Sequence, residues 1–195
     1  MSEYLAQDDV VDVSHPEISA LAARLRRDNP GTTDFARAAF TYARDEVAHS
    51  MDIGDPRVTV SASEVLREGV GLCFSKAHLL TALLRAGGVP AGLCYQRLSD
   101  GEGKFFLHGM VAVQLDGVWY RQDPRGNKPG VDAQFSLAEE RLAWQPRPEL
   151  GEADLEGIFV HPDPGLIAAL RGAGDALRLV AEGLPSDLQS QDTPA

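Results

Sequence analysis

The sequence predicts a fold that contains both helices and strands, with the helices concentrated in its first half. Apolar residues recur every three or four positions up to about residue 86, which is typical of amphipathic or buried helices. From residue 91 the apolar pattern changes to every second position, which is typical of strands. Between two of these strand-like segments stands Asp116-Gly117, a strong signal for a hairpin turn and hence for antiparallel pairing.

Composition limits the classes of function. The chain has 195 residues, of which 44% are hydrophobic and 24% charged, as in an ordinary single globular domain. A net charge of −11 repels phosphate backbones, so we expect no nucleic-acid partner. Since no apolar run approaches about 18 residues, we expect no membrane span. The acidic start of the chain does not resemble a secretory signal. Two cysteines, Cys73 and Cys94, are too few for a disulfide scaffold, so we expect a reduced, cytoplasmic protein.

Three helical segments are expected before residue 70. The first begins around Ser14-His-Pro-Glu and ends near Asn29, where Pro and Gly follow. The second carries an apolar stripe from Phe35 to Val47. Ser61 and Glu64 have the spacing of a capping box, which predicts a short third helix.

The segment from Gly69 to Gly88 predicts a buried helix that begins at a cysteine. A glycine-containing loop leads into a mostly apolar run, and Gly87-Gly88 followed by Pro90 is a typical helix stop. Cys73, Ala77, Leu80 and Leu84 fall on one face at helical spacing. We therefore expect Cys73 in the first turn of a helix that is buried along most of its length.

The second half of the chain predicts strands at 91–98, 106–115 and 118–122, followed by a loop at 123–130. Phe135 is expected to close one more strand, and 136–142 to form a short helix. The pattern further predicts an edge strand at 157–160 and helices at 164–170 and 174–181. The polar tail at 185–195 is expected to be disordered.

Cys73 is the strongest candidate for chemistry. The thiolate is the reactive form of cysteine, and the positive end of a helix dipole favours it. The N–H groups at the same helix end can also stabilise a developing oxyanion. The alternative is that Cys73 is a small core residue, since free cysteines are commonly buried. The second cysteine, Cys94, lies in the middle of a predicted strand and is expected to be a core residue.

A nucleophilic cysteine needs a base, and His108 is the best candidate among the five histidines. His78 shares the Cys73 helix, but five residues at about 100° each place it roughly 140° around the axis. His15 and His49 stand at helix ends and are expected to be caps or surface groups. His161 lies in a weakly patterned segment. His108 opens a predicted central strand, although a histidine in that position is often purely structural.

Asp123 is placed to orient His108. With a tight turn at Asp116-Gly117, residue i pairs near residue 233 − i, so Asp123 falls opposite position 110 and His108 opposite position 125. The two side chains are therefore expected within about one cross-strand neighbour of each other. A carboxylate there can hold the base by accepting from its second ring nitrogen. The alternative is that Asp123 only caps the loop that follows.

Several spaced elements together resemble the transglutaminase-like (papain-like) cysteine proteins. They are Gly71-Leu72-Cys73, the run from Leu83 to Ala91, His108-Gly-Met-Val-Ala-Val, Gly117-Val-Trp119 and Asp123-Pro-Arg. The resemblance implies an α+β fold in which the cysteine helix packs against an antiparallel sheet. It also implies that Cys73 is the nucleophile, His108 the base and Asp123 the residue that orients the base. We expect one such domain over residues 1–184, with its core at about 35–130.

The sequence departs from the family pattern after the histidine. Family members often have an aromatic residue in this region, as in His-Ala-Trp, whereas this chain has His108-Gly109-Met110, and we expect a change in the pocket wall. The Cys73 backbone N–H is one candidate oxyanion donor, but no side-chain donor is evident. No acidic loop with calcium-ligand spacing occurs either.

These observations predict a cysteine-dependent acyl transferase or amide hydrolase that acts on a peptide, protein or small amide and needs no metal or cofactor. A non-catalytic binding module with the same fold is the alternative, and a metal site of His108, Asp123 and His161 is a weaker one. Three cations near Asp123 could bind a carboxylate or phosphate of the substrate, or could simply solubilise the loop: Arg121, Arg125 and Lys128.

Overall fold

The computed structural model describes residues 2–189. Its helices are α1 (Pro16–Asp28), α2 (Thr32–Asp45), α3 (Ser50–Ile53), α4 (Ala62–Glu68), α5 (Cys73–Ala86), α6 (Pro164–Gly172) and α7 (Ala176–Glu182), with 3-10 turns η1 (Glu3–Leu5) and η2 (Pro148–Leu150). Its strands are β1 (Ala48–His49), β2 (Val70–Gly71), β3 (Ala91–Ser99), β4 (Phe105–Leu115), β5 (Val118–Gln122) and β6 (Ala153–Phe159).

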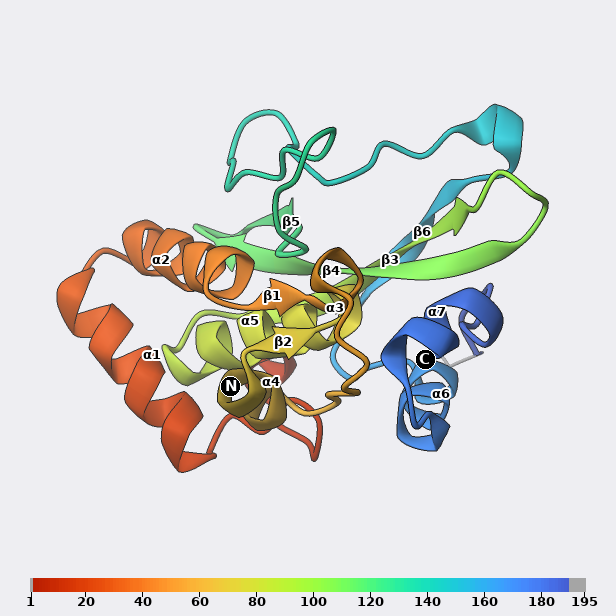
Figure 1. Ribbon diagram of the computed structural model, residues 1–195. Helices are drawn as coiled ribbons and strands as arrows, with labels where there is room; N and C mark the ends of the chain where they lie inside the picture. Colours follow the sequence, from red (N-terminus) through yellow and green to blue (C-terminus); the bar gives the residue numbers. More distant parts are fainter. Residues whose placement is uncertain (1, 190–195) are drawn as a thin grey trace.

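A four-stranded sheet forms one layer of the molecule, and helices form the other. The strand order is β5-β4-β3-β6, and all neighbours in this sheet are antiparallel. Helix α5 lies against β3 and β4, with α1 and α2 at one end of the helical layer and α6 and α7 at the other (Figure 1). The predicted α+β class, with the cysteine helix packed on an antiparallel sheet, is therefore confirmed.

Helix α5 is the centre of the core. Every residue from Phe74 to Arg85 is buried, because α1, α2 and α4 surround the sides that the sheet leaves open. The helix ends as predicted at a glycine pair, where Gly88 adopts a φ of 78° and Val89 N–H bonds back to the carbonyl of Leu84 at 2.9 Å. Cys73 is the first residue of this helix.

The hairpin between β4 and β5 has the predicted register. Asp116 and Gly117 have φ values of 51° and 81°, and a two-residue turn of this kind requires positive φ at both positions. Leu115 pairs with Val118 and Val111 with Gln122, so paired positions add to 233 as expected. The end of β5 is thereby brought beside His108 in β4.

Gly109 allows α5 to approach β4 closely. A Cβ atom at this position would lie 2.8 Å from Phe74 Cδ1 and 3.1 Å from Phe74 Cα. Met110 lies in a separate buried cluster with Cys94 and Ala112. It is not part of the cavity beside Cys73, so the expected change in the pocket wall at this position is wrong.

Two sequence predictions between β5 and β6 are also wrong. Phe135 lies in no strand, and residues 136–142 form no helix. The reason is that the side chain of Gln122 binds the backbone of this segment. Gln122 Nε2 donates to the carbonyl oxygen of Ser136 at 2.8 Å, and Gln122 Oε1 accepts from the backbone N–H of Ser136 at 3.2 Å. Side-chain to backbone bonds of this kind compete with regular secondary structure.

The last third of the described chain follows the prediction more closely. The edge strand is β6, which begins earlier than expected, and α6 and α7 correspond to the two predicted helices. Within the predicted disordered tail, Pro185 O accepts from Leu107 N–H at 3.0 Å, and Gln189 N–H donates to Asp163 Oδ2 at 2.8 Å. Residues 190–195 of that prediction lie outside the described residues. No helix within residues 2–189 has the length and apolar character needed to cross a bilayer.

Candidate active site

A cavity of about 150 Å³ lies at the N-terminal end of α5. Its walls are mainly apolar and include Leu72, Phe74, Phe106, Val180 and Leu184. The groups in it that can do chemistry are Cys73, His108, His49, Arg125 and Trp144. Elements far apart in the sequence, from α3 to the end of α7, therefore meet around the thiol.

Cys73 occupies the position in α5 that was predicted for a nucleophile. No side chain caps the N-terminus of the helix, so its first N–H groups remain available beside the thiol. Cys73 is partly exposed, whereas Cys94 is buried in the sheet, and burial raises the pKa of the Cys94 thiol to about 12. The two cysteines thus differ in their access to solvent.

His108 and Asp123 form a buried pair. His108 Nε2 donates to Asp123 Oδ2 at 2.8 Å, and the two side chains are 1% and 0% exposed. Asp123 also accepts from the backbone N–H groups of Arg125 and Ala143, each at 3.0 Å. These bonds fix the carboxylate, and because Asp123 binds Nε2, Nδ1 is the ring nitrogen left for the thiol.

The charges of this pair stabilise each other. Burial by itself would lower the pKa of His108, but the charge of Asp123 and the charge and hydrogen bond of the Cys73 side chain outweigh burial and raise it to about 10. Burial likewise works against ionised Asp123, yet His108 and the two backbone N–H groups keep the pKa of Asp123 below its usual range. The geometry therefore favours a protonated imidazole beside the sulfur.

Trp144 packs its ring edge-on against His108, with centroids 4.9 Å apart and planes at 86°. The guanidinium of Arg125 lies 5.3 Å from the centre of the same indole ring. Trp144 comes from the irregular segment before β6, and the sequence pattern alone gave no indication that it reaches His108. Its ring adds an apolar wall beside the imidazole.

The three cations near Asp123 take different positions. Arg121 pairs with Glu140 and Asp154 and does not line the cavity. Arg125 is 2% exposed, lines the cavity and forms a two-point ion pair with Asp52. Lys128 is exposed and also binds Asp52, at 2.9 Å. All three positive charges thus already have carboxylate partners in this structure.

The other histidines lie where their local sequence suggested, with one exception. His15 caps α1, the ring of His78 faces Val60 O at 2.8 Å, and His161 contacts Asp8 at 2.7 Å. His161 is therefore not brought to His108 and Asp123, which overturns the weaker idea of a metal site made by these three residues. Within residues 2–189, no group of three or more His, Cys, Asp or Glu side chains could hold a metal ion.

His49 is the exception. It caps α3 as expected for a helix end, but it is only 9% exposed and lines the cavity beside Cys73. Strands β1 and β2 place it there, because His49 pairs with Gly71, two positions before Cys73. The paired strands are two residues long, which is too short to leave a detectable pattern in the sequence.

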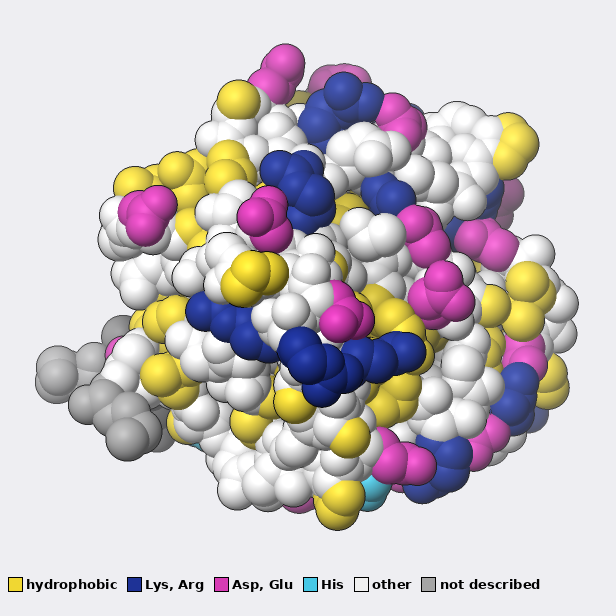
Figure 2. All heavy atoms as spheres, turned by 90° about the vertical axis from the view of Figure 1, so that its left-hand side faces the viewer, with side chains coloured by type: hydrophobic (Ala, Val, Ile, Leu, Met, Phe, Trp, Pro, Cys, Tyr) yellow, Lys and Arg dark blue, Asp and Glu magenta, His cyan; other side chains and the backbone are white. Residues whose placement is uncertain are grey.

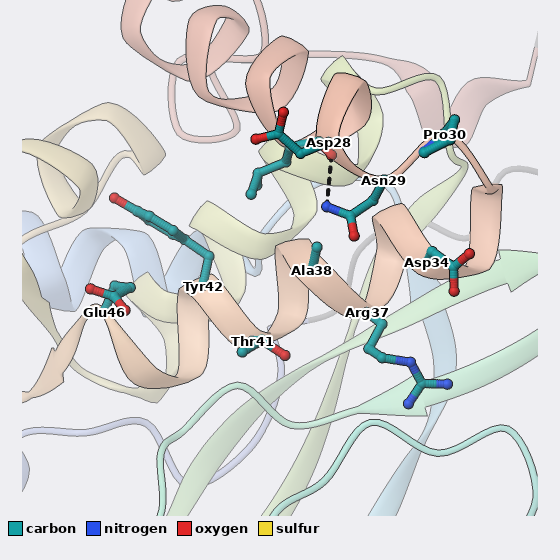
Figure 3. A pocket seen from close by; sticks show the side chains of 10 residues that line it. Asp28, Asn29, Pro30, Asp34, Arg37, Ala38, Thr41, Tyr42 and Glu46 are labelled. Atoms are coloured by element: carbon teal, nitrogen blue, oxygen red, sulfur yellow. Dashed lines mark hydrogen bonds between the residues drawn. The ribbon is translucent and has the colours of Figure 1, made fainter.

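A larger hollow of about 450 Å³ lies between α1 and α2 (Figure 3). Its lining contains neither Cys nor His and includes Asp28, Asp34, Arg37 and Glu46. Figure 2 shows the face of the molecule towards α1 and α2, where basic side chains form a band among apolar and acidic ones. This hollow is open and holds no nucleophile, so the smaller cavity at Cys73 is the candidate active site.

Comparison with known proteins identifies the family. The model of the transglutaminase-like superfamily core matches residues 19–124, which is more than half of the chain. The chain belongs to the transglutaminase-like superfamily. The match includes Cys73, His108 and Asp123. No curated protein gives a significant match to this transglutaminase-like chain.

Solved structures with partial similarity to this chain include two bacterial proteins. A candidate cysteine protease from Cytophaga hutchinsonii aligns with a TM-score of 0.50 and 19% identity, over 63% of this chain and 40% of that one. The periplasmic domain of TgpA from Pseudomonas aeruginosa aligns with a TM-score of 0.46 and 22% identity, over 62% of this chain and 46% of that one. Each alignment thus covers less than half the length of the solved protein. The alignment with the Cytophaga protein supports the papain-like transglutaminase fold.

Proposed function

We propose that this transglutaminase-like protein is a cysteine-dependent enzyme of acyl transfer or amide hydrolysis. The observation that carries the proposal is the meeting, in one apolar cavity, of a thiol at a helix N-terminus with an imidazole held by a buried carboxylate. Cys73 is the nucleophile, His108 the acid and base, and Asp123 the residue that holds the ring of His108.

The reaction would proceed in two stages. The Cys73 thiolate attacks the carbonyl carbon of an amide, and the electron pair of the C=O bond moves onto the oxygen. As the tetrahedral adduct collapses, the C–N bond breaks and protonated His108 gives its proton to the departing amine, which leaves a thioester on Cys73. His108 then removes a proton from water or from an acceptor amine. The deprotonated acceptor attacks the thioester carbonyl, the C–S bond breaks, and the Cys73 thiolate and protonated His108 are restored.

The substrate class follows from the family and the cavity. Transglutaminase-like proteins and their protease-like neighbours suggest a peptide or protein substrate, and a small amide is compatible with the same chemistry. The apolar walls favour an uncharged group next to the scissile bond. Arg125 is already neutralised by Asp52, so we do not assign it to substrate binding. The cytoplasmic location expected from the sequence stays a prediction.

Alkylation with iodoacetamide near neutral pH tests the nucleophile. Cys73 is expected to react much faster than Cys94, because it is partly exposed, lies at a helix N-terminus and lines the same cavity as His108, whereas Cys94 is buried. The variant His108→Gln is expected to slow the reaction at Cys73 and leave that at Cys94 unchanged. Peptide mapping by mass spectrometry measures both sites in one sample.

The alternative is a transglutaminase-like module that binds a partner without catalysis. It predicts slow labelling at Cys73 that does not depend on His108, and that result would overturn the proposal. If iodoacetamide alkylates Cys73 rapidly, incubation with p-nitrophenyl acetate should acetylate Cys73 in the wild type. The Cys73→Ala variant should not be acetylated at this site. Adding a primary amine then separates the two acyl acceptors, since a transamidase yields the acetylated amine and a hydrolase yields acetate.

A further inference from the structure

We propose that His49 provides the second hydrogen bond of an oxyanion hole, together with the backbone N–H of Cys73. This inference rests on the proposed function and names a catalytic residue for it that sequence reasoning did not supply. Acyl transfer places a negative charge on the substrate oxygen, and donors already aimed at that oxygen lower the barrier. The structure has two candidate donors at the cavity that holds the thiol, the backbone N–H of Cys73 and the ring of His49.

The backbone fixes where His49 lies. The parallel pairing of β1 and β2 sets His49 beside Gly71, and the chain then passes through Leu72 into the first turn of α5. His49 lines the cavity with Cys73 and His108. A carbonyl group attacked by the Cys73 sulfur therefore lies in the same cavity as the His49 ring.

The hydrogen bonds of the His49 ring decide which nitrogen carries its proton. Nδ1 accepts from the backbone N–H of Met51 at 3.3 Å, so a neutral ring must hold its proton on Nε2. Burial, with the nearby charge of Arg125, lowers the pKa of His49 to about 3 and so keeps the ring neutral. Within residues 2–189, Nε2 of His49 forms no hydrogen bond. This atom is not sealed from solvent, so it can reach a ligand in the cavity.

Two cationic side chains near His49, Arg125 and Lys76, are less suited to the task. Arg125 Nε also lacks a partner but is sealed from solvent, and the two outer nitrogens of Arg125 are bound to Asp52. The ammonium of Lys76 is buried and donates to the carbonyl oxygens of Arg44 and Val47. His49 lines the cavity, and its Nε2–H is neither sealed from solvent nor hydrogen-bonded within residues 2–189.

The chemistry assigned to His49 involves no proton transfer. When the sulfur–carbon bond forms, the carbonyl electron pair moves onto oxygen, and that oxygen accepts from Cys73 N–H and His49 Nε2–H. When the adduct collapses, the pair returns and both donors keep their protons. His49 therefore stabilises the transition state of acylation but has no part in a reaction that develops no oxyanion.

This difference defines the experiment. Acylation by p-nitrophenyl acetate forms a tetrahedral adduct, whereas alkylation by iodoacetamide displaces iodide directly and does not. Removing one oxyanion donor typically lowers kcat by about 10²- to 10³-fold. We expect His49→Ala to lower the acylation rate by that order while the alkylation rate of Cys73 stays within about threefold. His49→Gln, which keeps a side-chain N–H, is expected to recover at least about tenfold of the loss.

His15→Ala is the matched control. His15 caps α1 in the same way as His49 caps α3, because its Nδ1 accepts from the backbone N–H two residues later, but His15 lies outside the cavity. This variant loses the same kind of cap and should acylate at the wild-type rate.

Three outcomes would overturn the assignment. An acylation rate in His49→Ala equal to that of wild type removes His49 from the oxyanion hole. An equal fall in acylation and alkylation shows that His49 acts on the thiol instead. A wild-type protein that alkylates at Cys73 but never acylates contradicts the proposed function itself, so the two failures are distinguishable.

Discussion

His108 and Asp123 are two buried groups whose charges depend on each other. Because Asp123 and the Cys73 side chain raise the pKa of His108 to about 10, the folded protein keeps the imidazole proton at a pH where the unfolded chain, with a pKa of about 6.5, has released it. The stabilisation from this group is therefore complete below about pH 6.5 and is lost as the pH rises towards about 10.

Asp123→Asn is predicted to remove most of this loss of folding stability at alkaline pH, since the neutral amide no longer raises the pKa of His108. The measurement is the free energy of unfolding in urea at several pH values between about 6.5 and 10, for both proteins. Lys76, whose pKa burial lowers to about 8, titrates in the same range with the opposite sign in both proteins. The difference between the two pH profiles is therefore the quantity to read.

The same variant is expected to be less stable at every pH. An Asn side chain has one acceptor oxygen, whereas Asp123 accepts from Arg125 N–H, Ala143 N–H and His108. A buried N–H group left without an acceptor lowers the free energy of unfolding by about 1–3 kcal/mol. His108→Gln removes the titrating ring itself and should flatten the profile in the same way. Parallel profiles for wild type and both variants would show that His108 is not charged in the folded protein.

At the scale of elements, the contact between α5 and β4 places the thiol beside the imidazole. Gly109→Ala is predicted to push Phe74 and the first turn of α5 away from the strand, because the added Cβ would meet Phe74 Cδ1 at 2.8 Å. Overpacking of this kind destabilises by about 1–3 kcal/mol. Alkylation of Cys73 is expected to slow at the same time, as the thiol moves from His108.

Gly172→Ala provides the comparison for this variant. Gly172 is the last residue of α6, and a Cβ there would meet nothing within 4 Å. Urea unfolding and iodoacetamide kinetics should leave this control close to wild type. A Gly109→Ala protein that behaves like the control would mean that α5 does not depend on close approach at this glycine.

The sequence was most informative where one element is long or a turn has a strict requirement. The apolar run from Cys73 to Ala86 and the Asp116-Gly117 turn correctly predicted the helix, the hairpin register and the approach of His108 to Asp123. The same reasoning failed where side chains replace regular pairing, as at Ser136, whose backbone is bound by Gln122. It missed His49 in the cavity because a two-residue parallel pair has no sequence period.

At the scale of the whole molecule, one buried side chain joins segments that are distant in sequence. Arg85, in the last turn of α5 and 3% exposed, donates from Nε to Ala91 O at 2.9 Å. It also donates from its two outer nitrogens to Ala6 O and Val160 O, each at 2.7 Å. The N-terminal segment, the start of β3 and the connection from β6 to α6 thus meet at a single guanidinium.

Arg85→Met is therefore predicted to weaken the whole structure while it leaves the cavity chemistry in place. Methionine matches much of the volume but leaves three buried carbonyl oxygens without their donor, which should cost about 3 kcal/mol or more. For a chain of this size that corresponds to a fall in Tm of about 6–12 °C.

The control is Arg57→Met, which removes an exposed surface ion pair with Asp55 and Glu68 and should change Tm little. Well below the transition, Cys73 in Arg85→Met should still react with iodoacetamide at the wild-type rate, because Arg85 lies at the opposite end of α5 from the thiol. Equal Tm values for the two variants would show that the three contacts of Arg85 do not hold the termini of the domain together.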